Sequence, residues 1–153
     1  MEANDSRRYP PRPVLGVGAL IFKADRVLLI ERGKEPLKGQ WSLPGGAVET
    51  GERVEDAIIR EMFEETGLEV TPTQIAVIFE RIMYDAESLP EYHYLLIDFF
   101  CEVRGGSLCP GDDCRNAAWF TLEEIELLPI TVGTLEVIRA ARSGATSVTI
   151  ARP

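Results

Sequence analysis

Glutamates crowd into one short segment of this sequence, between Gly45 and Gly67. A glycine turn there leads into an expected helix, on which residues follow one another at about 100°. One arc of that helix is acidic and the opposite arc is apolar, so the apolar arc is expected to pack on a core. The acidic arc holds Arg60, Glu61, Glu64 and Glu65, and the apolar arc holds Ile58, Ile59, Met62 and Phe63.

The acidic arc is locally unfavourable in two ways. Glu61 and Glu65 are like charges at i,i+4, a spacing that costs about 0.2–0.5 kcal/mol per pair. Gly67 predicts the end of the helix, so Glu64 and Glu65 lie in its last turn, where the helix dipole disfavours each anion by about 0.3–1 kcal/mol. A plain solvated face is the alternative, but two unfavourable features at one spot are typical of a functional site.

A hard divalent cation would relieve this crowding. Mg²⁺ takes oxygen ligands and is usually held by one or two carboxylates together with substrate phosphates. Ala57 lies in the middle of the acidic arc and Val54 at its edge, so no long side chain is expected to block an ion. Such an ion can lower the pKa of a bound water so that hydroxide attacks phosphorus. A structural Ca²⁺ site fits less well, because the helix lacks a loop of alternating oxygen ligands.

The segment resembles the signature of the Nudix hydrolases. That signature is glycine, five residues, Glu, seven residues, Arg-Glu, an aliphatic residue, any residue, Glu-Glu, any residue, Gly and an aliphatic residue. Every position is matched, by Gly46, Glu52, Arg60, Glu61, Met62, Glu64, Glu65, Gly67 and Leu68. Residues 41–46 also resemble the usual lead-in, and looser similarity extends over roughly residues 14–142.

The resemblance implies a role for each signature residue. Mg²⁺, with Mn²⁺ as a substitute, would be bound by three glutamates and one backbone carbonyl, those of Glu61, Glu64, Glu65 and Gly46. Arg60 would orient the neighbouring glutamates and Glu52 would pair with that network. The proton acceptor stays open between Glu61, Glu102 and Asp113, because in the family this duty moves between a signature glutamate and a later loop.

The resemblance also implies the reaction, which is Mg²⁺-dependent hydrolysis of a phosphoanhydride in a nucleoside diphosphate linked to another moiety. ADP-ribose or a related nucleoside diphosphate sugar is the first choice of substrate. One alternative is a nucleoside triphosphate pyrophosphohydrolase that removes oxidised nucleotides. Another is a non-catalytic, nucleotide-sensing module, which usually lacks signature carboxylates that this chain keeps. Family members are often dimers, so a homodimer is an expected assembly.

Three residues outside the signature are candidates for substrate contacts. Arg32 belongs to a polar loop just before the glycine turn and could contact phosphate. Tyr84 is the first residue of an expected loop at residues 84–91 and could stack on a base, although aromatic residues on strands mostly serve packing. Glu102, near the end of an expected strand, could be a further metal ligand if the strand places its carboxylate near the ion.

Composition limits the partners and the compartment. The 153 residues contain 45% hydrophobic and 27% charged residues and carry a formal net charge of −9, which disfavours a nucleic-acid polymer or an anionic membrane as partner. No run approaches the roughly 20 apolar residues of a membrane span, so a cytoplasmic protein is expected. The three cysteines lack the spacing of a zinc site and are expected to be free thiols: Cys101, Cys109 and Cys114.

The remaining pattern predicts an α/β domain with a mixed β-sheet flanked by helices, which the resemblance specifies as an α/β/α sandwich. Strands are expected at 14–22 and 27–30, as a hairpin, and at 75–79, 92–103 and 117–120. Helices are expected from Thr121 to before Pro129 and over 132–141. A flexible arm (1–13) would precede the domain (14–142), and a tail (143–153) with a short strand at 148–150 would follow. Gly16 and Gly18 lack the third glycine of a dinucleotide fingerprint and instead predict close backbone approach.

Overall fold

The computed structural model describes residues 7–109, 114–144 and 150–151. Within these ranges the strands form two sheets, and three helices accompany them. The first sheet has the order β5 (Gly45–Ala47), β1 (Val14–Leu20), β7 (Pro90–Gly106), β6 (Leu68–Tyr84) and β9 (Ile150–Ala151). The second contains β2 (Phe22–Lys23), β3 (Arg26–Arg32), β4 (Trp41–Ser42) and β8 (Cys114–Thr121). The helices are α1 (Val54–Thr66), α2 (Leu122–Ile125) and α3 (Thr134–Arg142).

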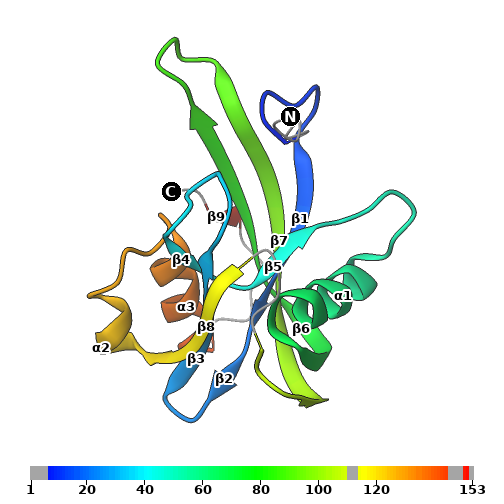
Figure 1. The fold of residues 1–153 in the computed structure, drawn as a ribbon, viewed down its shortest axis with the longest axis vertical. Helices are drawn as coiled ribbons and strands as arrows, with labels where there is room; N and C mark the ends of the chain where they lie inside the picture. Colours follow the sequence, from blue (N-terminus) through cyan, green and yellow to red (C-terminus); the bar gives the residue numbers. More distant parts are fainter. Residues whose placement is uncertain (1–6, 110–113, 145–149, 152–153) are drawn as a thin grey trace.

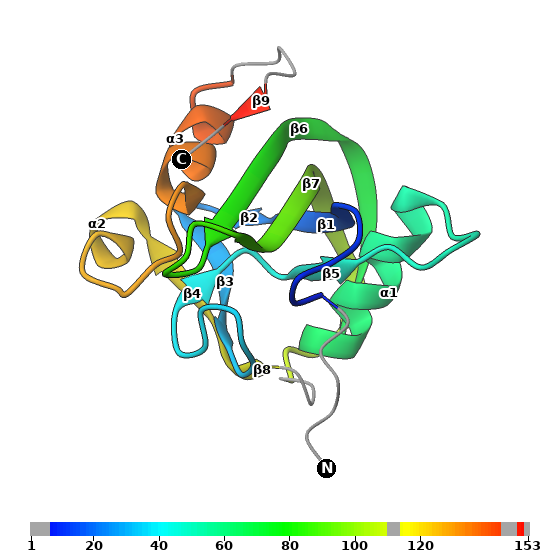
Figure 2. The same ribbon diagram turned by 90° about the horizontal axis from the view of Figure 1, so that it is seen from above.

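The first sheet is mixed and lies between helices. β1 runs parallel to β7 and antiparallel to β5, while β6 and β7 are antiparallel. Helix α1 lies on one side of the molecule, and α2 and α3 lie on the other (Figures 1 and 2). One core cluster joins α1 to the sheet and a second joins α2 and α3 to it. The predicted fold class, a mixed sheet flanked by helices in an α/β/α sandwich, is confirmed.

The expected hairpin of residues 14–22 with 27–30 is wrong for most of its length. Only Phe22 and Lys23 pair with β3, whereas β1 pairs with β5 and β7 in the other sheet. Most of β1 is buried, from Gly16 to Leu20, and a strand covered on both faces belongs in the middle of a sheet rather than at the edge of a hairpin.

β6 and β7 form a hairpin much longer than the apolar runs predicted. Its tip extends beyond the helices (Figure 1). Pro72 lies inside β6, at a register shift between Pro72 and Gln74, where its missing N–H is tolerated. The start of the described chain is attached to this hairpin, because Tyr9 N donates to Glu91 O at 2.7 Å and Tyr9 Oη donates to Asp85 Oδ2 at 2.6 Å.

Helix α1 ends where the sequence predicts, but its buried face is rotated from the predicted one. Gly67 adopts a left-handed conformation with φ 77°. Ile58 and Met62 are fully buried, as expected, but Ile59 is 40% and Phe63 is 58% exposed. Ala57, expected beside an open metal site, is instead part of the core. The reason is that the side chains of Glu61 and Glu65 also point towards the inside of the protein, so the buried face of the helix includes them and leaves out Ile59 and Phe63.

The C-terminal elements follow the sequence closely. At the start of α2, Thr121 Oγ1 accepts from Glu124 N at 3.2 Å and Thr121 N donates to Glu124 Oε2 at 3.1 Å, which confirms the predicted capping box. The predicted tail strand is confirmed at residue 150, where β9 pairs with β6, while 148–149 lie outside the described residues. No helix among the described residues is long and apolar enough to cross a membrane.

The rotated face of α1 makes a matched stability test possible with two neighbouring isoleucines. Ile58→Ala should lower the free energy of unfolding by about 2–5 kcal/mol, because Ile58 is fully buried. Ile59→Ala should lower it by less than about 1 kcal/mol, because that side chain is 40% exposed. Urea unfolding followed by circular dichroism measures both, and equal losses would contradict this orientation of the helix.

Candidate active site

Two glycines let β5 approach both the neighbouring strand and the helix. β5 pairs with β1 through Gly18 and Gly45, and a Cβ at Gly45 would collide with the Val17 carbonyl. A Cβ at Gly46 would collide with the Glu61 carboxylate. The glycine turn therefore allows the backbone of β5 to lie directly against a glutamate of α1.

Arg60 is the centre of the hydrogen-bond network on α1. Its Nε and Nη2 donate to the two carboxylate oxygens of Glu52 at 2.8 and 2.9 Å. Its Nη1 donates to Glu61 Oε1 at 2.8 Å and to Glu64 Oε2 at 3.2 Å, and Nη2 also donates to Ala47 O at 3.0 Å. Arg60 and Glu52 are thus hydrogen-bonded to each other, while the orienting role that the resemblance implied for Arg60 stays a prediction.

The hydrogen bonds between Arg60 and Glu52 shift the pKa values of both side chains. Hydrogen bonding from Arg60, helped by a backbone hydrogen bond, lowers the pKa of Glu52 to about 2. In return, the carboxylates of Glu52 and Glu61 raise the pKa of Arg60. Both groups are therefore charged throughout the physiological pH range.

The three signature glutamates are not equivalent. The Glu61 side chain is 13% exposed, and Glu65 is 8% exposed with its Oε2 accepting from Gly45 N at 3.0 Å. Both line one cavity, together with Gly46. The Glu64 side chain is 57% exposed, pairs with Arg60 and is not part of the cavity lining. The structure thus brings Gly46, Glu61 and Glu65 together and leaves Glu64 at the outer edge.

The donor set at this end of the cavity is compatible with Mg²⁺. It offers carboxylates from successive turns of α1 and the backbone of Gly46, all oxygen donors. In the part of the chain that the structure describes, no group of three or more acidic, His or Cys side chains is arranged around a single metal position. Because Mg²⁺ commonly uses only one or two carboxylates and takes its other ligands from phosphate and water, Glu61 and Glu65 satisfy its needs.

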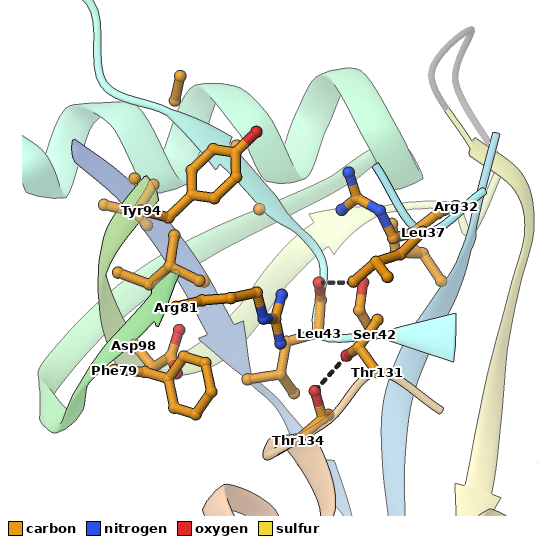
Figure 3. Close-up of a pocket in the computed structure, with 18 of the residues that line it drawn as sticks. Arg32, Leu37, Ser42, Leu43, Phe79, Arg81, Tyr94, Asp98, Thr131 and Thr134 are labelled. Carbon is orange, nitrogen blue, oxygen red and sulfur yellow. Dashed lines mark hydrogen bonds between the residues drawn. The ribbon is translucent and has the colours of Figure 1, made fainter. Parts of the chain in front are cut away.

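The cavity has a volume of about 310 Å³, within the usual range for small-molecule sites. Its walls come from both sheets and from α1 and α3 (Figure 3). Besides the two glutamates it is lined by four cationic side chains, those of Arg7, Arg32, Lys34 and Arg81. An acidic end and a cationic wall facing one space suit a metal-bound phosphate ester.

Arg32, a predicted phosphate contact, lines the cavity. Its Nε donates to Pro36 O at 2.7 Å, which anchors the side chain, and burial lowers the pKa of its guanidinium. Tyr84 and Glu102 do not line it. Tyr84 is 60% exposed near the tip of the hairpin, and Glu102 pairs with Arg104 near the opposite end, beside Thr71.

Substrate contacts by Tyr84 and Glu102 are therefore not supported by the geometry. Both lie on the long hairpin but far from its middle, and it is the middle of β6 and β7 that borders the cavity. The sequence did not predict these positions, because the strands were expected to be shorter and their register was unknown. Asp113, the other candidate proton acceptor, lies outside the described residues.

Arg81 and Asp98 were not predicted as site residues, yet both line the cavity. Arg81 Nη2 donates to Val132 O at 2.9 Å, and its guanidinium lies 5.0 Å from the centre of the Phe79 ring. Asp98 is 4% exposed. Its position within an otherwise apolar run was a visible signal, whereas nothing in the sequence around Arg81 distinguishes it from a surface arginine.

A family comparison identifies the chain. The model of the NUDIX domain matches residues 12–141. The chain belongs to the NUDIX family. Members of this family act as pyrophosphohydrolases on phosphoanhydride bonds.

Individual relatives of this NUDIX protein carry different names. A Methanocaldococcus jannaschii protein named ADP-ribose pyrophosphatase is 39% identical over 116 residues, which cover 76% of this chain and 66% of that protein, just under two thirds. Nucleoside triphosphatase NudI of Salmonella arizonae is 32% identical over 106 residues, covering 66% and 75%. The crystal structure of a MutT NUDIX hydrolase from Burkholderia pseudomallei superposes with a TM-score of 0.73 at 29% identity, covering 84% of this chain and 98% of that one.

The Arg60–Glu52 pair predicts a specific acid dependence of stability. The pKa of folded Glu52, about 2, lies below the ordinary value of 4.5, so its contribution is present above pH 4.5 and is lost as the pH falls towards 2. The difference in unfolding free energy between the parent and Glu52→Gln should therefore shrink over that interval. Urea unfolding at a series of pH values measures this. In an Arg60→Met background the same comparison should show a much smaller pH dependence, because only the hydrogen bond from Glu49 N remains to lower the pKa of Glu52, and an undiminished slope would assign it to another group.

Proposed function

We propose that this protein is a Mg²⁺-dependent hydrolase of a phosphoanhydride bond in a nucleoside diphosphate linked to another moiety, with ADP-ribose or a related nucleoside diphosphate sugar as substrate. The observation that carries the proposal is the placement of Glu61 and Glu65 at one end of a cavity whose other walls supply Arg32 and Arg81. Oxygen donors for a hard cation and guanidinium groups for phosphate thus face the same space.

Each residue of the site has a proposed task. Glu61, Glu65 and the Gly46 carbonyl would hold Mg²⁺, which when bound would screen the diphosphate and acidify a water. Arg60 keeps Glu61 in place by a hydrogen bond of 2.8 Å, and Gly45 N keeps Glu65 in place at 3.0 Å. Glu64 would be a third carboxylate ligand, although its side chain is exposed and does not line the cavity.

Proton acceptance is proposed for Glu61. Of the three acceptors considered from the sequence, Glu61 lines the cavity and Glu102 does not. Arg32, which also lines it, is proposed to contact a phosphate oxygen, because a guanidinium matches phosphate in charge and geometry.

The choice of an ADP-ribose-like substrate is supported by the name of the 39% identical relative. A nucleoside triphosphate is the second candidate and is supported by the name of the NudI relative, at 32% identity. The absence of nucleic-acid and membrane partners, the homodimer and the cytoplasmic location stay predictions.

The products distinguish the two candidate substrates. With Mg²⁺, ADP-ribose should give AMP and ribose 5-phosphate, whereas a triphosphate would give a monophosphate and pyrophosphate. Chromatographic separation of products over a panel of both classes measures the preference. Chelation with EDTA should abolish turnover, and added Mg²⁺ or Mn²⁺ should restore it. Turnover that survives complete chelation would exclude the proposed role of the metal.

Glu65→Gln is the sharpest test of the carboxylate end. The amide oxygen of Gln can still accept from Gly45 N, so the fold should be retained, while the loss of charge should reduce kcat by about a hundredfold or more. Steady-state kinetics with ADP-ribose measure the effect. Glu55→Gln, an exposed change in the first turn of the same helix, is the matched control and should keep parental turnover. Equal rates for the parent and Glu65→Gln would refute the assignment of this end.

A further inference from the structure

Asp98 is a buried carboxylate for which the described part of the protein supplies no close partner. It lies on β7, is 4% exposed and lines the cavity. No described residue donates a hydrogen bond to it or forms an ion pair with it within 4.0 Å. Arg81 acts on it only over a longer range, and burial raises the pKa of Asp98 to about 7. A buried carboxylate without a hydrogen bond is costly, so a ligand that supplies a donor would be favoured here.

The backbone next to Asp98 leaves room for this carboxylate. Gly18 lies opposite Asp98 on the parallel strand β1, and a Cβ at Gly18 would collide with Asp98 Oδ1. The absence of a side chain at Gly18 therefore leaves space for the carboxylate at the cavity wall. The need for space beside Asp98 explains why a glycine occupies position 18, which the rejected dinucleotide fingerprint did not explain.

The surroundings of Asp98 suit a flat heteroaromatic ring. Leu43, Leu96 and Val137 supply apolar wall, and Phe79 lies beneath the guanidinium of Arg81. Figure 3 shows Asp98, Phe79 and Arg81 grouped on one side of the cavity and Arg32 on the other. A ring bound here would meet one acceptor, Asp98, and one donor, Arg81, between apolar surfaces, which is the usual composition of a small-molecule site.

The distance from the carboxylate end fits a nucleoside. Asp98 pairs with Gly18, and Gly18 pairs with Gly45, whose N–H binds Glu65. Two strand spacings of about 4.8 Å separate the backbone of Asp98 from that of Gly45, or roughly 10 Å in all. A ribose can bridge this interval between a metal-bound phosphate and a base.

We propose that Asp98 is a specificity residue that accepts a hydrogen bond from the exocyclic amino group of the substrate's nucleobase, while Arg81 donates to the adjacent ring nitrogen. The inference rests on the proposed function and extends it to the base. Adenine presents an amino donor beside a ring acceptor, which complements this pair. Hypoxanthine carries a carbonyl oxygen in place of the amino group, so it would direct an acceptor at the carboxylate.

Kinetics with ADP-ribose and its hypoxanthine analogue, IDP-ribose, test the proposal at pH 8, above the pKa of Asp98. The parent should prefer ADP-ribose in kcat/KM by roughly tenfold or more. Asp98→Asn should bring the two substrates within about threefold, mainly through KM, because the amide can donate to the hypoxanthine carbonyl. Asp25→Asn, at an exposed turn outside the cavity lining, is the matched control and should keep the parental preference.

Two results would overturn the assignment. Asp98→Asn could keep the full preference for ADP-ribose, or it could slow both substrates equally, as expected if Asp98 binds a ribose hydroxyl or serves only structure. Should the parent hydrolyse neither compound, the proposed function fails, and calorimetric titration with AMP and IMP still decides the base contact. Tighter binding of AMP by the parent, equalised in Asp98→Asn, would support it, and equal binding by the parent would refute it.

Discussion

The guanidinium of Arg60 is the interaction on which the acidic helix depends. It makes five hydrogen bonds, to Glu52, Glu61, Glu64 and the Ala47 carbonyl, and so joins the helix to the end of β5 and to the loop that follows it. One group thereby offsets part of the repulsion among the glutamates and sets the direction of Glu61. The crowding that suggested a metal is thus already relieved in part within the protein, and what remains for a cation is the inward pair at the cavity.

The glycines of β1 and β5 provide the space that this arrangement needs. Gly46 admits the Glu61 carboxylate, Gly45 approaches Val17, and Gly18 admits the Asp98 carboxylate. Side chains at these positions would push the carboxylates away from the cavity wall. Close backbone approach, expected for Gly16 and Gly18, is found at Gly16, which lies against the Gly46 carbonyl, whereas Gly18 lies against the side chain of Asp98.

Cationic side chains in the cavity explain how a protein with a negative net charge could bind an anionic ligand. The chain carries a net charge of −9, yet four cationic side chains line this space. Arg32 and Arg81 each use one N–H for a backbone carbonyl, of Pro36 and Val132, and so are held in position before a ligand arrives. Such preorganisation reduces the ordering cost of binding phosphate.

Local spacing in the sequence was enough to predict the helix with its end at Gly67 and the capping box at Thr121. The match to the family signature then implied the link between Arg60 and Glu52. All of these depend on residues close together in the chain. Tertiary structure alone decided that Glu61 and Glu65 face the cavity while Glu64 does not, that Tyr84 and Glu102 lie away from it, and that Arg81 and Asp98 border it. The placements on β6 and β7 follow from the register of β1, β6 and β7, and those on α1 follow from its packing against β5. Register joins segments far apart in sequence, so no local pattern could determine it.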